Sequence, residues 1–269
     1  MHLRSCARTV SLLALLFVFA QPGILAQAPP TTPPGAVVSK RDPQALQIIS
    51  DSLAAMGATP DAFQHAVLSG RMVPAGDAPA KTFQTTYQIR GRRVAFLRQI
   101  TSTAGTETFA SGSGKPLRLS ANGKSFRFAD HVALAAQPFE LPFVILAAAL
   151  RDPAYSAVVV DTAPGASLHI KIEDETDVVS QAVTGQDWFF DPATKLPTRV
   201  EYRLPDVVDA GKSEPASCDY VAFQAVNGMS LPKELHVIEP GGTAEMFFDS
   251  VDFNGPVSAD FDMPAGGLQ

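Results

Sequence analysis

The residues that could do chemistry in this sequence are scattered along the chain. His65, His131, His169 and His236 lie one per segment, without the paired spacing that brings two ring nitrogens to one metal ion. The acidic run 173–177 lacks the glycine and the spaced oxygen ligands of a dedicated calcium loop. We therefore expect no metal site, with the histidines on the surface or on strand faces and the acidic run in a solvated turn.

Neither of the two glycine–lysine sequences fits a phosphate-binding loop. Five residues before Gly123 stands Arg118, where such a loop requires glycine, and Lys115 is followed by Pro116 instead of serine or threonine. The G-x-S-x-G elbow of serine hydrolases is also missing from the sequence. The sequence thus predicts a protein without a cofactor and without catalysis. A hydrolase whose carboxylates meet only through folding stays open as an alternative.

The cysteines point to a structural role. Cys6 precedes the N-terminal apolar run, so it is badly placed to be the acylated cysteine of a lipoprotein. Cys218 then has no partner for an internal disulfide in the mature chain. Its neighbours Ser217 and Asp219 include no cation that would lower its pKa. We expect a structural thiol in a fold that depends on its hydrophobic core.

The N-terminus has the layout of a secretory signal peptide. Arg4 and Arg8 precede the apolar run 10–20, and small residues follow up to Ala26, where cleavage fits best. The run of about 11 residues is shorter than the roughly 20 that a membrane-spanning helix needs. We expect residues 1–26 to be removed and the mature chain to be periplasmic or secreted, without a transmembrane segment.

The charge of the mature chain argues against nucleic acid as a partner. Removal of Arg4 and Arg8 leaves 19 basic side chains against 27 acidic ones, a net charge near −8. Proteins that bind nucleic acid neutralise phosphates with lysine and arginine, and no basic stripe with interleaved aromatic residues occurs here. Anionic membrane surfaces are disfavoured for the same reason.

A flexible tether and one helix precede the main body of the chain. Residues 27–41 are rich in proline and polar side chains, which predicts a flexible or extended tether. Asp42 and Pro43 then form a helix start, and Gly57 forms its stop. Between them the apolar residues recur at helical spacing: Leu46, Ile49, Leu53 and Met56. We assign residues 42–269 to a single domain.

After this helix the apolar period changes from 3.6 to 2, which indicates a sheet. Short runs rich in valine, isoleucine, phenylalanine and threonine alternate with turn residues: 83–89 with 94–100, 117–119 with 126–128, and 188–190 with 200–204. About ten strands follow each other in hairpin succession. The expected fold class is mainly β with α, as a curved antiparallel sheet or a barrel.

One segment breaks the strand pattern. Residues 141–150 read LPFVILAAAL, with Pro142 suited to a first helical turn and Pro153 suited to stop the helix. A helix of about ten residues cannot cross a bilayer, and a helix that is apolar on all sides must be enclosed. We expect it on the concave face of the curved sheet.

Together these pieces resemble the periplasmic lipoprotein-carrier superfamily of LolA, LolB and LppX. The resemblance rests on the helix start 42–46, the apolar helix, the strand and turn 188–197 (WFFDPATKLP) and the closing 261–264 (FDMP), and it spans about residues 42–264. It implies a half-barrel whose helices close an apolar space that holds acyl chains. The chain is longer than the shortest carriers, and no residue has a definite position matching their buried arginine.

Two interpretations of the enclosed helix stay open. The residues by themselves favour a helix that fills the concave face, as in an envelope interaction or scaffold domain. The resemblance favours a cavity for a lipid acyl chain or a lipoprotein tail, with an envelope protein as the partner for delivery. The expected cavity residues are Tyr87, Phe96, Phe143, Leu146, Leu150, Trp188 and Tyr202.

Overall fold

The computed structural model describes residues 39–253 with gaps at 59–63, 77–78, 91–92, 112–117, 122–123, 129–131, 133–134, 161–166 and 207–210. The predicted signal peptide 1–26, the tether up to residue 38, the turn at 122–123 and the closing segment 261–264 lie outside the described residues.

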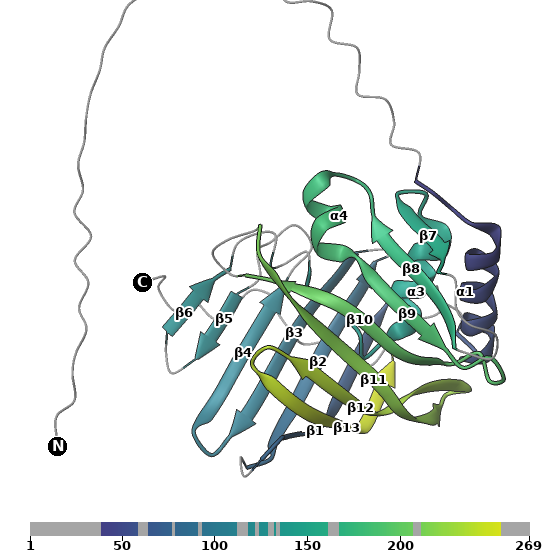
Figure 1. The fold of residues 1–269 in the computed structure, drawn as a ribbon. Coiled ribbons are helices and arrows are strands. Elements are labelled where there is room, and N and C mark those ends of the chain that lie inside the picture. The colour runs from purple at the N-terminus through teal and green to yellow at the C-terminus, as the bar shows by residue number, and fades with distance from the viewer. Residues whose placement is uncertain are drawn as a thin grey trace, which may run out of the picture. The chain divides into compact units, whose positions relative to one another are not determined.

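Within the described residues, one antiparallel sheet of thirteen strands forms the body of the molecule, in the order β6-β5-β4-β3-β2-β1-β13-β12-β11-β10-β9-β8-β7. It is curved and stays open between its edge strands β6 and β7 (Figure 1). This confirms the predicted fold class, with more strands than the ten expected. The strands are β1 (His65–Pro74), β2 (Lys81–Arg90), β3 (Arg93–Ser102), β4 (Gly105–Ser111), β5 (Arg118–Ala121), β6 (Lys124–Arg127), β7 (Tyr155–Val159), β8 (Leu168–Asp174), β9 (Gln186–Phe190), β10 (Pro197–Pro205), β11 (Ser213–Val226), β12 (Met229–Glu239) and β13 (Gly242–Phe253).

The chain's two halves are joined where its first strand pairs with its last. All strand pairs except β1 with β13 are neighbours in the sequence, as hairpin succession predicts. The β1–β13 register shifts between Ser69 and Gly70, which forms a bulge. A Cβ atom on Gly70 would lie 1.9 Å from the carbonyl oxygen of Phe247, so only glycine allows the two backbones to approach this closely.

The turn between β9 and β10 shows how local chemistry sets the strand register. The Asp191 carboxylate accepts hydrogen bonds from the backbone N–H groups of Ala193 at 2.9 Å and Thr194 at 2.6 Å. These bonds lower the pKa of Asp191. The turn places Trp188 opposite Val200, and both side chains are buried on the core face.

Helix α1 (Pro43–Ala55) begins and ends where its signals predict. The Asp42 side chain accepts a hydrogen bond from Gln44 N–H at 2.9 Å, and Gly57 turns the chain out with φ +64°. The helix end is fastened to the β11–β12 turn, because Met56 O accepts a hydrogen bond from Ser230 N–H at 2.8 Å.

Helix α3 (Pro142–Arg151) is the apolar helix expected on the core face. Its buried side chains include the consecutive residues Phe143, Val144, Ile145 and Leu146, which point to all sides of the helix axis. Arg41 caps its C-terminal end. The guanidinium donates to four carbonyl oxygens, those of Ala149, Leu150, Asp152 and Tyr155, at 2.7 to 3.0 Å.

The acidic run 173–177 divides between two elements instead of forming only a turn. Glu173 and Asp174 end β8, while Asp177 caps a short helix, α4 (Val178–Thr184), by accepting a hydrogen bond from Ser180 N–H at 2.8 Å. Helix α4 was not expected from the sequence. Its first apolar residue, Val178, is 82% exposed, so its apolar residues do not follow the spacing of one buried helix face.

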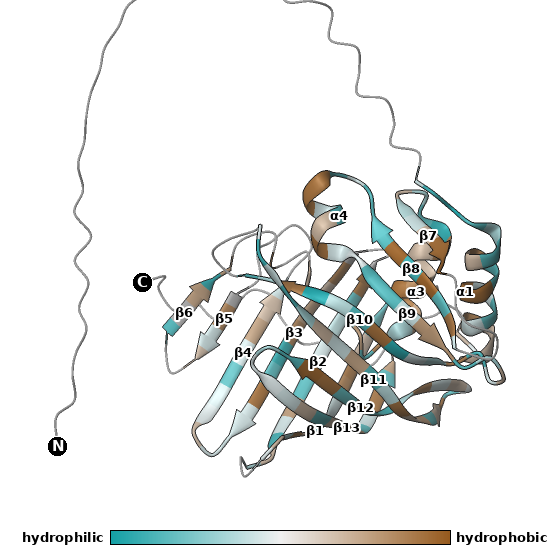
Figure 2. Cartoon of the chain, in the orientation of Figure 1, coloured by the Kyte–Doolittle hydropathy of each residue, from teal (hydrophilic) through white to brown (hydrophobic). Residues whose placement is uncertain are grey.

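The hydrophobic core lies between one face of the sheet and the helices α1 and α3. Apolar residues are concentrated on these elements (Figure 2). Trp188 is fully buried and stacks on Phe190 and Tyr220, with ring centroids 6.3 and 6.1 Å away. Across the described residues, none of the helices has the length and apolar character needed to span a bilayer.

Candidate ligand cavity and its polar cluster

A cavity of about 470 Å³ lies on the core face of the sheet, beside the part that the helices fill. This volume falls in the range of about 300–1,000 Å³ that small-molecule sites occupy. Strands from both halves of the sheet and the segment before α3 supply its walls. The apolar lining includes Met72, Phe83, Phe96, Ile100, Phe109, Leu204, Leu235, Val237, Ala244 and Met246.

The structure divides the seven expected cavity residues into two groups. Tyr87, Phe96 and Tyr202 line the cavity. The other four belong to the packed region around α3: Phe143, Leu146 and Trp188 are at most 1% exposed, and the partly buried Leu150 packs against the same core. The enclosed helix therefore fills one part of the core face, and the cavity occupies the neighbouring part.

A short segment just before α3, residues 139–140, contacts strands from both halves of the sheet and forms one wall of the cavity. We call this segment the strap. Phe139 stacks on Tyr202 of β10 with ring centroids 4.3 Å apart, and its carbonyl accepts a hydrogen bond from Tyr220 of β11 at 3.0 Å. On the other side, Glu140 accepts a hydrogen bond from the hydroxyl of Tyr87 on β2 at 2.7 Å. The strap thus places a carboxylate inside an apolar cavity.

Arg98 of β3 neutralises that carboxylate. Its guanidinium forms an ion pair with Glu140 and donates hydrogen bonds to Tyr87 Oη at 3.2 Å and Thr85 Oγ1 at 3.1 Å. Glu140 is 8% exposed and Arg98 26% exposed, so the pair is largely shielded from water. Unpaired, either charge would be costly to hold there.

Sequence reasoning missed this pair, although one signal was present. Arg98 occupies an inward position in the alternation of β3, between Phe96 and Ile100. A charged residue at such a position indicates a partner on the core side. The identity of the partner was not readable, because Glu140 is 42 residues away along the chain.

The shifts in pKa keep Arg98 and Tyr87 in fixed protonation states. Burial lowers the pKa of Arg98, but Glu140, Tyr87 and Glu239 together raise it by more, so the net shift is upward and the guanidinium stays charged. Burial and then the Glu140 charge raise the pKa of Tyr87 well above its usual value. The Tyr87 hydroxyl therefore stays neutral and acts as a donor.

A second polar pair lies at the edge of the same cavity. Tyr202 Oη donates a hydrogen bond to Glu239 Oε1 at 3.2 Å. Tyr202 is buried, which raises its pKa, whereas Glu239 is exposed to solvent. Cys218 also lines the cavity and is 1% exposed, and burial raises the pKa of its thiol. The cavity residue Cys218 thus has the low thiolate content of a structural cysteine.

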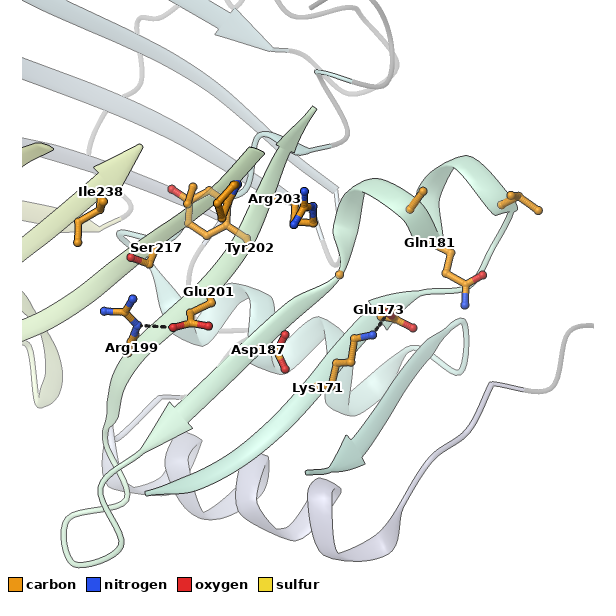
Figure 3. A pocket seen from close by; sticks show the side chains of 15 residues that line it. Lys171, Glu173, Gln181, Asp187, Arg199, Glu201, Tyr202, Arg203, Ser217 and Ile238 are labelled. Atoms are coloured by element: carbon orange, nitrogen blue, oxygen red, sulfur yellow. Dashed lines mark hydrogen bonds and ion pairs between the residues drawn. The ribbon is translucent and has the colours of Figure 1, made fainter. Parts of the chain in front are cut away.

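A different, charged cleft of about 760 Å³ lies on the opposite face, between α4 and strands β8–β12 (Figure 3). Its charges are largely paired with each other: Lys171 Nζ lies 2.6 Å from Glu173, and Arg199 Nε lies 2.8 Å from Glu201. Exposed surface pairs of this kind contribute about 0–1 kcal/mol each.

The histidines do not form a metal centre in the described part of the chain. His169 Nε2 lies 2.8 Å from Asp187 Oδ1 and its ring stacks on Phe189. His236 Nδ1 lies 3.8 Å from Asp219 Oδ2. Within the described ranges, three or more potential metal-ligating side chains do not converge.

Comparison with known proteins finds similar folds but no relative by sequence. No protein-family model matches the chain, and no curated protein is significantly similar in sequence. Several solved structures are similar in fold, and three of them are described here. A domain assigned as an outer membrane lipoprotein-sorting protein from Vibrio parahaemolyticus has TM-score 0.53 and 14% identity, covering 81% of this chain and 96% of its own.

A LolA superfamily protein from Nitrosomonas europaea has TM-score 0.51 and 12% identity, covering 81% of this chain and 97% of its own. A DUF1329 family protein from Desulfovibrio piger has TM-score 0.52 and 11% identity, covering 83% and 99%. Identities this low speak only to the fold. With its open antiparallel sheet wrapped around a central apolar helix, the chain has the half-barrel fold of the LolA superfamily.

Proposed function

We propose that the mature protein is a periplasmic or secreted carrier that shields a lipid acyl chain or a lipoprotein tail from water, without catalysis. The observation that carries this proposal is the cavity of about 470 Å³ on the core face, whose lining is mostly apolar and includes a small number of polar side chains. A concave apolar site with a few placed polar groups is the usual design of a small-molecule site.

The energetics of such a cavity suit an acyl chain. Burial of one methylene is worth about 0.8 kcal/mol, so a chain of about 14 carbons would contribute on the order of 10 kcal/mol before entropic losses. Submicromolar affinity follows without a cofactor. Release would then require a partner protein that competes for the chain.

Two further features support the assignment. The signal peptide predicted at residues 1–26 directs the chain to the compartment where such carriers act. One protein of similar fold is assigned to outer membrane lipoprotein sorting.

The first test is direct detection of cargo. The mature chain is purified from its native envelope, extracted with organic solvent and analysed by mass spectrometry, and a fluorescent acyl probe is titrated into the delipidated protein. Stoichiometric lipid and saturable probe binding are expected. An empty extract together with no saturable binding would overturn the proposal and leave an interaction domain as the function to pursue.

A matched pair of variants locates the binding site. Ala244 lines the cavity on β13, whereas the next residue, Glu245, is exposed on the other face. Ala244→Phe should fill the cavity and weaken probe binding by at least about tenfold, because roughly two methylenes of ligand lose their space. Glu245→Phe adds the same bulk outside and should leave binding unchanged. Equal effects of both variants would place the probe elsewhere.

A further inference from the structure

The polar atoms of the cavity are gathered in one place. Arg98, Glu140 and Tyr87 form one hydrogen-bonded group, and Tyr202 and Glu239 form a second. The two groups lie close enough for their charges to interact, and we call these five residues the polar cluster. The remaining walls carry mostly apolar side chains. A ligand that satisfies both regions has an apolar tail and one polar head group beside the cluster.

The cluster has an excess of negative charge. Arg98 is its only cation among the described residues that line the cavity, and its charge is already balanced by Glu140. Glu239 also lies near enough to Arg98 to contribute to the upward shift of the arginine pKa. One guanidinium therefore faces two carboxylates. The hydrogen-bond partner of Glu239 itself is Tyr202, a neutral donor.

The uncompensated carboxylate lies at the rim of the cavity. Glu239 is the last residue of β12, and its side chain is exposed. Gly242, at the start of β13, also lines the cavity and has no side chain that could cover Glu239. Leu204 and Pro205, at the end of β10, line the same cavity. A head group at Glu239 would stay partly hydrated while its tail reaches the apolar walls.

We propose that the cargo is a lipid whose head group carries an ammonium group, and that Glu239 binds this group at the rim. This inference rests on the carrier function proposed above and adds the chemical class of the cargo. A protonated amine would be attracted to the Glu239 carboxylate. The carboxylate of a free fatty acid would instead be repelled by Glu239, and Arg98 could not compensate because it is already paired with Glu140.

The test compares ligands that differ only in the head group. Dodecylamine, dodecanol and dodecanoate, each below its aggregation concentration, compete with the fluorescent acyl probe for the mature protein at neutral pH. Because Glu239 is solvent-exposed, the ion pair is weak, and we expect the amine to bind about three- to fivefold more tightly than the alcohol. Dodecanoate should bind more weakly than the alcohol.

Glu239→Gln should bring the amine and the alcohol to within about twofold of each other, and Glu245→Gln, on the other face of the sheet, should keep the wild-type preference. Added salt should reduce the preference in the wild type but not in Glu239→Gln, because ions screen exposed charges. An unchanged preference in Glu239→Gln, or dodecanoate competing as well as dodecylamine, overturns the head-group assignment while the carrier function stands. Failure of all three ligands to displace a bound probe also overturns the head-group assignment alone, whereas an absence of probe binding together with an empty lipid extract overturns both.

Discussion

Replacement of Arg98 by methionine should destabilise the protein through the carboxylate that the change leaves behind. Glu140 is 8% exposed and would keep only the Tyr87 hydroxyl as a partner. Removing one member of a buried ion pair costs about 3–5 kcal/mol in the free energy of unfolding. Because Arg98 is 26% exposed and water can approach it, we expect the lower limit, about 3 kcal/mol.

The double variant Arg98→Met/Glu140→Leu separates the charge effect from lost packing. It removes both charges, so the penalty of an unpaired buried carboxylate disappears, and only the hydrogen bonds to Tyr87 and Thr85 are lost. A loss of about 1 kcal/mol relative to the wild type is expected. The double variant should therefore be more stable than Arg98→Met by about 2 kcal/mol.

Urea unfolding followed by the fluorescence of Trp188 measures both effects, because the chain has one tryptophan and its side chain is fully buried. For a domain of this size, 3 kcal/mol corresponds to a fall of roughly 6–12 °C in Tm. Additive effects of Arg98→Met and Glu140→Leu, each below about 1 kcal/mol, would refute the argument that the pair is electrostatically coupled in a shielded site.

Three other predictions concern the scaffold. Gly70→Ala should cost about 2–3 kcal/mol by forcing β1 away from Phe247, whereas Gly241→Ala, with open space around its Cβ, should change the free energy of unfolding by less than about 0.5 kcal/mol in the same urea assay. Arg41→Met should lower stability by about 3 kcal/mol because four carbonyl oxygens, at the end of α3 and the start of β7, lose the guanidinium as a donor; an unchanged Tm would show that water replaces the guanidinium at no cost. Cys218 should react with a thiol reagent at pH 8 only as fast as the protein opens, since burial raises the pKa of the thiol. Because the unfolded thiol ionises near pH 8.5 and the folded one does so only at higher pH, the stability that Cys218 contributes should be complete below about pH 8 and decline as the pH rises above it, a slope that Cys218→Ala should remove.

Much of the architecture was predictable because its signals are local. Asp42, Pro43 and Gly57 mark the bounds of α1 through capping chemistry that involves residues only a few positions apart. The same holds for the Asp191 turn, whose carboxylate bonds to backbone groups two and three residues ahead. Helix α4 escaped prediction because it has seven residues and its valines are exposed.

Only the tertiary structure decided whether a cavity remains beside the apolar helix. The sequence by itself determined that 141–150 is an apolar helix that must be enclosed, and that strands with inward aromatic residues surround it. Whether such a helix fills the whole concave face depends on the curvature of thirteen strands and on where the strap 139–140 crosses them. Side-chain periodicity specifies which face a residue takes but not the distance to the opposite wall. Tertiary structure also decided that Arg98 meets Glu140 and that Tyr202 meets Glu239, because long-range pairs are brought together only when the whole sheet has curved around the core.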